Sequence, residues 1–189
     1  IEPIPVAIKD SLIHFRGVEK IFPRIWGYYY DAPSDAVFTI LAADSALLGN
    51  EYEFPKENEA LVGSGYMETH TTEIGQRFLL QDNQSQLIGF QLVGSFSADT
   101  DLLTRDLIVL HPKAARKLLG LENGFAMDLA ICVINNDEST NIAGKINRMI
   151  PGVRVVTRDQ LQRTYERIFS WKGGIFFFGI LFSFLAFLV

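Results

Sequence analysis

The last residues of the chain, "GGIFFFGILFSFLAFLV" at 173–189, contain no charged side chain. As a helix this segment would be about 26 Å long, close to the hydrocarbon thickness of about 30 Å. Its phenylalanines would lie on every side of the helix, and a helix that is apolar all round is deeply buried or faces lipid. The segment therefore predicts the start of a transmembrane helix, truncated where the chain stops.

The residues expected to anchor this helix are aromatic or aliphatic, with a tryptophan and a lysine at the membrane interface. They are Trp171, Lys172, Ile175, Phe176, Phe177, Phe178, Ile180, Leu181, Phe182, Phe184, Leu185, Phe187 and Leu188.

The preceding residues, 158–172, predict an amphipathic stalk helix continuous with the membrane helix. Leu161, Tyr165 and Ile168 have the spacing of one helical face. Thr157 and Gln160 match a capping box, which places the helix start after Thr157. The basic residues of this stalk would, taken alone, favour a cytoplasmic flank by the positive-inside rule.

Two regions of alternating strand and helix flank the middle of the chain. Residues 128–135 predict a strand, Asp137 caps a helix at 138–149, and 153–157 predict a second strand, parallel to the first. Near the N-terminus, Ile8, Leu12 and Phe15 predict a helix that ends near Gly17, followed by an extended segment. The similarity of the two regions indicates two halves of a split βαβ sandwich.

Between these halves the pattern is mostly that of strands. Strands are predicted within 36–44, 77–81, 85–96 and 106–111, with a turn at "DNQS" and a short helix from Pro112 to Gly120. The expected fold class is therefore α+β: a split βαβ subdomain with an inserted β-rich subdomain, followed by a long stalk and transmembrane helix.

Several function classes are disfavoured by composition and motifs. The net charge of −5 argues against a nucleic-acid partner. Cys132 is the only cysteine, which excludes an internal disulfide. The "GSG" at 63–65 lacks the rest of a phosphate-binding loop and predicts a turn that opens a helix. Met67, Glu68 and His70 are interpreted as surface residues rather than metal ligands. We expect no cofactor, no metal site and no catalytic site.

An aromatic run, "FPRIWGYYYDAP" at 22–33, is the strongest candidate for partner contact. In a strand, Tyr28 and Tyr30 would face one way and Tyr29 the other. Core packing is the main interpretation of Trp26, Tyr28, Tyr29 and Tyr30, and contact with a partner is the alternative.

The order of several short motifs resembles the extracytoplasmic core domain of MacB/FtsX-like ABC transporter permeases. These motifs are "ALVGSGYMETH", "GQRFLLQD", "FQLVGSF", "RDLIVLHPKAARKLLG", "FAMDLAICVINN" and "IPGVRVVTRDQL", followed by the stalk and membrane helix. The resemblance covers nearly the whole chain.

This resemblance implies a porter-like α/β subdomain at 1–36 and 127–157, an inserted β-rich subdomain at 37–126, a stalk at 158–172 and a membrane helix from 173. It implies a non-enzymatic domain on the extracytoplasmic or periplasmic side of the inner membrane. The implied partners are a cytoplasmic ABC ATPase subunit, a second permease copy, and an extracytoplasmic adaptor or lipoprotein. An extracytoplasmic sensor domain of a signalling receptor, which would end in the same stalk and span, is the alternative.

Overall fold

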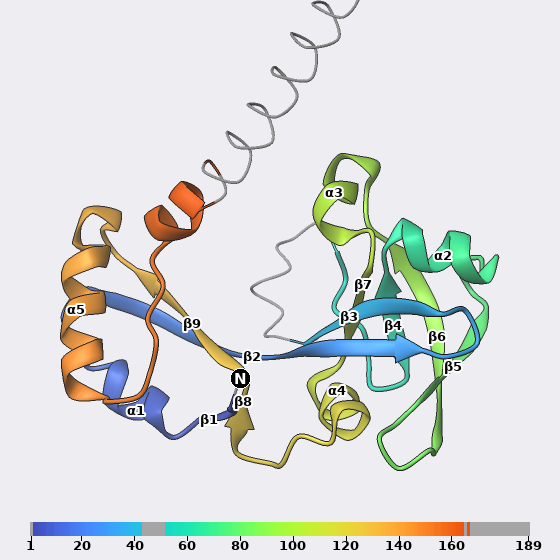
Figure 1. The fold of residues 1–189 in the computed structure, drawn as a ribbon, viewed down its shortest axis with the longest axis horizontal. Coiled ribbons are helices and arrows are strands. Elements are labelled where there is room, and N and C mark those ends of the chain that lie inside the picture. The colour runs from blue at the N-terminus through green and yellow to red at the C-terminus, as the bar shows by residue number, and fades with distance from the viewer. Residues whose placement is uncertain (1, 43–51, 165, 167–189) are drawn as a thin grey trace, which may run out of the picture. The chain divides into compact units, whose positions relative to one another are not determined.

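The computed structural model describes residues 2–42, 52–164 and 166. Internal contacts divide the chain into two compact units, Ile1–Cys132 and Val133–Val189. The fold class is α+β, as predicted, and Figure 1 shows its elements. The predicted stalk beyond residue 166 and the membrane-anchoring residues 171–188 lie outside the described residues. Within the described ranges, no helix combines the length and hydrophobicity of a membrane span.

A mixed sheet of seven strands forms most of the first unit. Its strands are β2 (Val18–Asp31), β3 (Ala36–Ala42), β4 (Glu59–Val62), β5 (Arg77–Gln81), β6 (Leu87–Ser95), β7 (Leu107–Leu110) and β9 (Asp128–Val133). They lie in the order β5-β6-β4-β7-β3-β2-β9. β4 runs parallel to β6 and antiparallel to β7, and β3 runs parallel to β7.

The main core lies on one face of this sheet and includes α2 (Ser64–His70) and α4 (Pro112–Leu119). On β3, Phe38 and Ile40 are buried, whereas Val37 between them and the turn is exposed. This alternation is the two-residue period of a strand with one covered face. Tyr66 of α2 packs edge-on against Phe38, with ring centroids 5.0 Å apart.

The predicted turn "DNQS" connects β5 to β6. The Oδ1 atom of Asp82 accepts hydrogen bonds from the backbone N–H groups of Gln84 and Gln86, at 2.9 and 2.8 Å. Ser85 has a positive φ of 64°. An aspartate at the first position of a turn stabilises it by this kind of side-chain bond, which is why the sequence pattern was informative.

The predicted helix from Pro112 is α4, and both of its ends form as expected. Pro112 is the first helical residue, where its missing N–H costs no helical bond. Gly120 follows the helix with a left-handed φ of 65°, which a residue with a side chain rarely adopts. His111 caps the helix start, because its Nδ1 accepts from the N–H of Lys113.

The N-terminal segment contains β1 (Ile4–Pro5) and α1 (Ile8–Leu12) before β2 begins. β1 pairs with β8 (Phe125–Ala126) in a separate two-stranded sheet. The predicted N-terminal helix is therefore present, and Leu12 is its buried residue. Gly17 has a φ of 93° in the turn that leads into β2. The first unit also contains the short helices η2 (Ala98–Thr100) and α3 (Asp101–Thr104).

The second unit begins with η3 (Asn136–Glu138) and α5 (Ser139–Met149). The predicted cap at Asp137 is wrong: Asn135 is the capping residue, and its side chain accepts from the N–H of Asp137. The predicted strand at 153–157 is also wrong, since these residues have no regular structure and pair with no strand within the described chain. β-Branched residues favour strands only where a neighbouring strand is available for pairing.

Candidate functional site

The predicted aromatic run forms the second half of β2, which makes an antiparallel hairpin with β3. Tyr28 is paired with Thr39 and Tyr30 with Val37. The side chains of Tyr28, Tyr30 and Val37 are 74%, 59% and 55% exposed. Since paired residues share one face of a sheet, these side chains form one exposed surface. We call this surface, with Trp26, the aromatic face.

Tyr29 has a different environment from its neighbours, as the strand pattern predicted. It packs against the main core, and its hydroxyl oxygen accepts a hydrogen bond of 2.9 Å from the N–H of Gln81. Burial raises the pKa of this phenol. Tyr29 therefore connects β2 to the edge strand β5, and it is not available to a partner in the way that Tyr28 is.

Trp26 belongs to a polar cluster that joins β2 to the start of β9. Its indole Nε1 donates to Oδ2 of Asp128 at 2.9 Å. Arg24 donates to both carboxylate oxygens of Asp128, at 2.6 and 2.7 Å. The N–H of Met127 donates to the carbonyl of Arg24 at 2.9 Å. A two-pronged arginine–carboxylate pair fixes geometry as well as charge. We call Arg24, Trp26 and Asp128 the clamp.

Sequence reasoning did not single out Arg24 or Asp128. The two residues are 104 positions apart, and each is an ordinary charged residue in an ordinary strand pattern. Their pairing depends on the neighbouring positions of β2 and β9 in the sheet. Without that topology, the sequence offers no signal that would bring them together.

The "VGSG" and "VGSF" motifs lie at the ends of the parallel strands β4 and β6, where Val62 pairs with Ser95. A Cβ atom on Gly63 would lie 1.8 Å from the carbonyl oxygen of Thr104. A Cβ on Gly94 would lie 2.9 Å from the side chain of Leu61. Both glycines are therefore required by close packing, and the predicted turn opening a helix is confirmed at Ser64.

A network of charged side chains covers this junction. Arg105 forms ion pairs with Glu68 of α2 and with Asp101 of α3. The hydroxyl of Ser64 donates to Asp101, and this bond is the main cause of a lowered pKa of that carboxyl. The network joins α2 to α3 across the backbone contact made by Gly63. Its function is to hold the motif in place, since no phosphate-binding loop is formed here.

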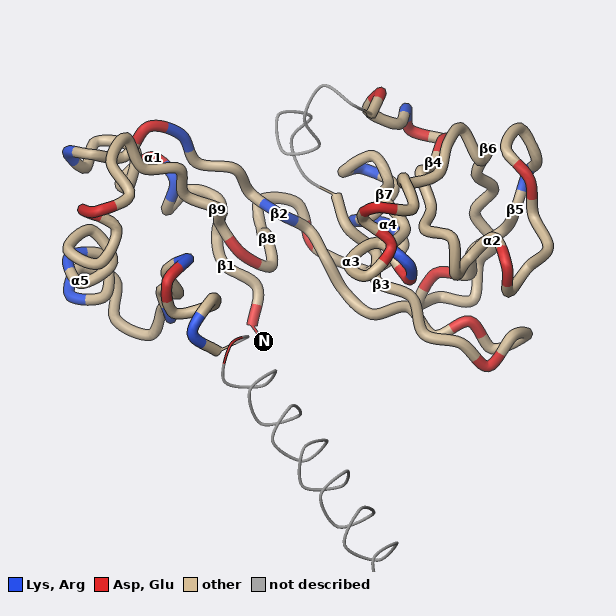
Figure 2. The backbone as a smooth tube through the Cα atoms, turned by 90° about the horizontal axis from the view of Figure 1, so that it is seen from above, with Lys and Arg blue, Asp and Glu red and all other residues tan. Residues whose placement is uncertain are grey.

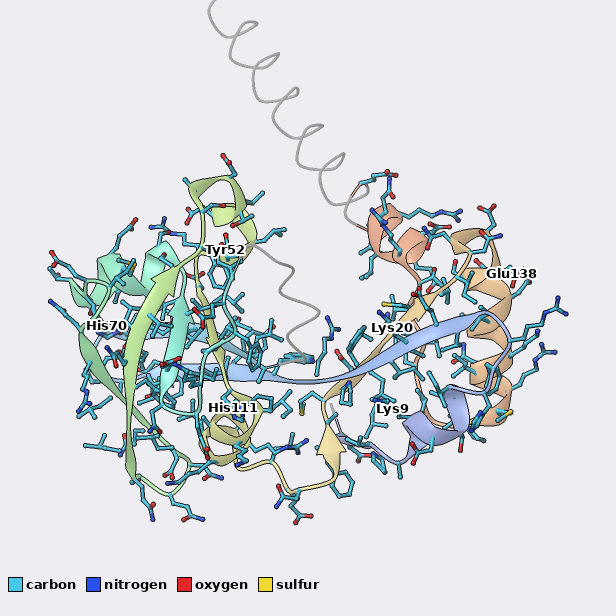
Figure 3. All side chains as sticks on the ribbon, turned by 180° about the vertical axis from the view of Figure 1, so that it is seen from behind. Lys9, Lys20, Tyr52, His70, His111 and Glu138 are labelled. Atoms are coloured by element: carbon cyan, nitrogen blue, oxygen red, sulfur yellow. The ribbon has the colours of Figure 1, made fainter. Side chains whose placement is uncertain are left out.

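His70 is not the surface residue that the sequence interpretation expected. Figure 3 shows it beside the β2–β3 hairpin. Its ring lies 4.4 Å from that of Tyr66, measured between centroids, and its Nε2 lies 3.4 Å from Oδ2 of the buried Asp31. The side chain is 23% exposed. The hairpin returns over the end of α2 and covers the histidine, a contact that the local sequence does not encode.

Burial of Tyr66 gives a testable pH dependence. Tyr66 is 2% exposed, and burial, with a smaller contribution from Asp31, raises the pKa of its phenol. A raised pKa means that the folded state favours the protonated phenol, so stability should fall as pH rises above about 10. Tyr66→Phe should reduce this alkaline loss, measured by urea unfolding at neutral and alkaline pH. Tyr28→Phe on the aromatic face is the matched control and should keep the full loss; equal slopes for the two variants would contradict the prediction.

The predicted capping box at the start of the stalk is confirmed. The Oγ1 atom of Thr157 accepts from the N–H of Gln160 at 3.3 Å, and the side chain of Gln160 accepts from the N–H of Thr157 at 3.1 Å. Residues 158–164 and 166 are helical. The stalk therefore begins where predicted, and its continuation through the membrane-anchoring residues stays a prediction.

Comparison with known proteins gives two structural relatives. No family model and no curated protein matches the sequence. The extracellular domain of the noncanonic ABC-type transporter YknZ from Gram-positive bacteria has a TM-score of 0.52 and 9% identity, over 78% of this chain and 84% of that one. The periplasmic region of MacB from Actinobacillus actinomycetemcomitans has a TM-score of 0.56 and 8% identity, over 88% of this chain and 84% of that one. The chain therefore has the fold of the MacB-like extracytoplasmic transporter domains that its motifs resemble.

Proposed function

We propose that this chain is the extracytoplasmic domain of an ABC transporter permease. In this function it couples ATP hydrolysis by a cytoplasmic subunit to the movement or handling of a substrate or partner outside the membrane. The observation that carries the proposal is the likeness to two transporter domains over 78% and 88% of the chain. The order of the sequence motifs supports it independently of the coordinates.

In this proposal the subdomains take the roles that the resemblance implies. Residues 1–36 and 127–157 form the porter-like part, and 37–126 form the insert. The clamp is suited to joining them, because β2 runs from the first part into the second and Asp128 lies where the chain returns. The domain itself carries out no catalysis, and ATP is hydrolysed by a separate subunit.

The capped helix after Thr157 would transmit motion from the membrane to the domain. A helix transmits displacement only while its hydrogen bonds are continuous, and an internal proline removes one bond and kinks the helix. The partners in this proposal are an ATPase subunit, a second permease copy, and an adaptor or lipoprotein. The aromatic face offers a contact surface through Trp26, Tyr28 and Tyr30, whose exposed rings suit interfaces.

The stalk can be tested with a single substitution in the complete transporter. Gln162→Pro should abolish most transport while leaving the unfolding temperature of the domain within a few degrees, because residue 162 is exposed. Gln162→Ala keeps the helix and is the matched control, for which we expect normal transport. Normal transport by the proline variant, assembled with its ATPase, would count against coupling through this helix. A kinase domain instead of further spans in the full gene would favour the sensor alternative.

A further inference from the structure

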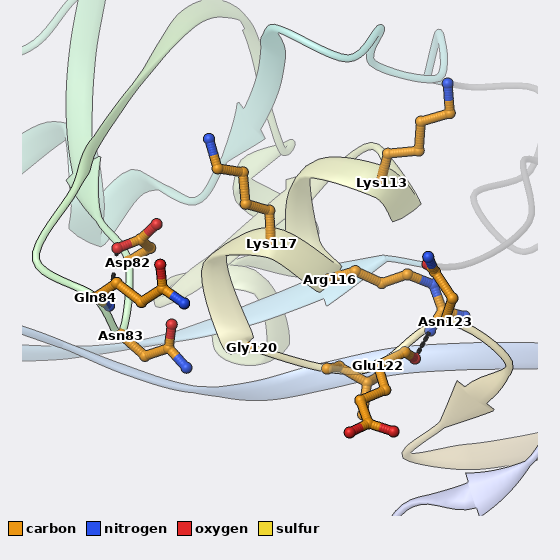
Figure 4. Close-up of a pocket in the computed structure, with 10 residues that line it drawn as sticks. Asp82, Asn83, Gln84, Lys113, Arg116, Lys117, Gly120, Glu122 and Asn123 are labelled. Atoms are coloured by element: carbon orange, nitrogen blue, oxygen red, sulfur yellow. Dashed lines mark hydrogen bonds between the residues drawn. The ribbon is translucent and has the colours of Figure 1, made fainter.

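A polar cavity of about 450 Å³ lies beside α4, between the β5–β6 turn and the segment that follows Gly120 (Figure 4). Its lining comes from three stretches of the first unit and contains few apolar side chains. The residues are Asp82, Asn83, Gln84, Lys113, Arg116, Lys117, Gly120, Leu121, Glu122 and Asn123. None of them belongs to the aromatic face or to the clamp.

The walls of the cavity are held by bonds that leave its shape fixed. The turn is fixed by Asp82 through the two backbone N–H groups that it accepts from. The opposite wall is fixed by Arg116, whose Nη1 donates to the carbonyls of Glu122 and Phe125 at 2.8 and 2.6 Å. The turn and the helix end touch, since a Cβ on Gly120 would lie 2.1 Å from Nδ2 of Asn83. A site with preformed walls loses little entropy when it binds a ligand.

Several hydrogen-bond donors in this cavity are not used within the protein. Among the residues that the structure describes, the side-chain amides of Asn83, Gln84 and Asn123 form no hydrogen bond, and Lys117 forms no ion pair. Lys113 has one ion pair in the same ranges, at 3.7 Å with the exposed Glu57. An exposed pair of this kind contributes little and is easily exchanged for another anion.

The charges around these donors favour an anion. The lining has three basic and two acidic residues, in a chain whose net charge is −5. The charge of Asp82 is already partly balanced by its backbone N–H donors. Figure 4 shows Lys113 and Lys117 extending from the same side of α4, whereas the carboxylate of Glu122 points away from both. The unused positive charge therefore lies next to the unused amides.

We propose that this cavity binds an oxyanion group, a phosphate or a carboxylate, of a small polar ligand. Lys113 and Lys117 balance its charge, and the amides of Asn83 and Gln84 donate to its oxygens. Charge-assisted hydrogen bonds of this type are stronger than those between neutral groups. The site does not depend on the proposed transporter function, because it is built only from contacts within the first unit.

The test is a binding titration on the complete chain, purified in a non-ionic detergent. The probes are inorganic phosphate, malonate, and vesicles of phosphatidylglycerol. We expect at least one probe to bind, and Lys113→Gln with Lys117→Gln to weaken that binding about tenfold or more, as the loss of two charge-assisted bonds predicts. Lys145→Gln with Arg148→Gln, two exposed residues of α5, changes the net charge equally and is the matched control.

The probes distinguish the source of the anion. Binding of phosphate or malonate identifies a free anion, and binding of vesicles alone identifies a lipid head group; either supports the site if only the cavity variant is weakened. No binding by any probe, or equal weakening in both double variants, would overturn the proposal. Unfolding temperatures of both variants, measured without probe, show whether a loss of binding results from a loss of folding.

Discussion

Gly63→Ala is expected to lower the free energy of unfolding by about 3 kcal/mol or more. The added Cβ would lie 1.8 Å from the carbonyl oxygen of Thr104 and 2.2 Å from that of Arg105. Both obstacles are backbone atoms, and the segment is held in place by the bond from the N–H of Gly63 to the carbonyl of Leu107 at 2.8 Å. Alanine can be accommodated only if β4 and the chain before β7 move apart.

The conformation of Gly63 makes this test specific. Its φ and ψ are −76° and 164°, a region that alanine adopts freely, so the loss would come from steric overlap and not from backbone strain. Gly144→Ala is the matched control: no atom lies within 4 Å of its Cβ position, and it is inside α5. That variant should gain about 1 kcal/mol, since alanine favours a helix. Urea unfolding followed by circular dichroism measures both, and a Gly63→Ala protein as stable as the native one would refute the packing argument.

Asp128→Ala is expected to cost about 2–3 kcal/mol of folding stability. It removes a carboxylate that accepts from Arg24 twice and from Trp26 once, and it leaves these donors without a partner. Arg24 is 42% exposed, so water limits the loss. Glu57→Ala breaks the exposed pair with Lys113 and serves as the control, with an expected loss below about 0.5 kcal/mol.

A double-mutant cycle separates the clamp from other effects of the substitution. The loss for Arg24→Ala with Asp128→Ala should be smaller than the sum of the two single losses, by about 1–2 kcal/mol. Additive losses would show that the two side chains contribute independently and that no clamp exists. In the complete transporter, Asp128→Asn tests function: if the clamp couples the two parts, transport should fall more than stability does.

Local patterns in the sequence predicted the elements that depend on local physics. The α4 helix, with Pro112 and Gly120 at its ends, the turn at Asp82 and the capping box at Thr157 each depend on a few neighbouring residues. The alternation of Tyr28, Tyr29 and Tyr30 was also predicted, because the strand period alone decides which face a side chain occupies.

The features that were missed depend on pairing between distant segments. β4 was not predicted as a strand, since four apolar residues are a weak signal until β6 and β7 lie beside them. The strand expected at 153–157 has suitable residues but no partner within the described chain. His70 and the clamp became visible only when the hairpin and β9 were placed, because the segments involved are far apart in the sequence.

The length of β2 has a consequence for how this domain can be rebuilt by recombination. One uninterrupted strand of 14 residues pairs with β3 from Ile25 onward and carries the clamp at Arg24. An insertion of one residue between these two stretches would turn every later side chain of the strand to the opposite face. Tyr28 and Tyr30 would then point inward and Tyr29 outward. Chimaeras that exchange the inserted region between relatives should therefore keep an even number of residues between the join and the hairpin, and they should exchange position 24 together with position 128.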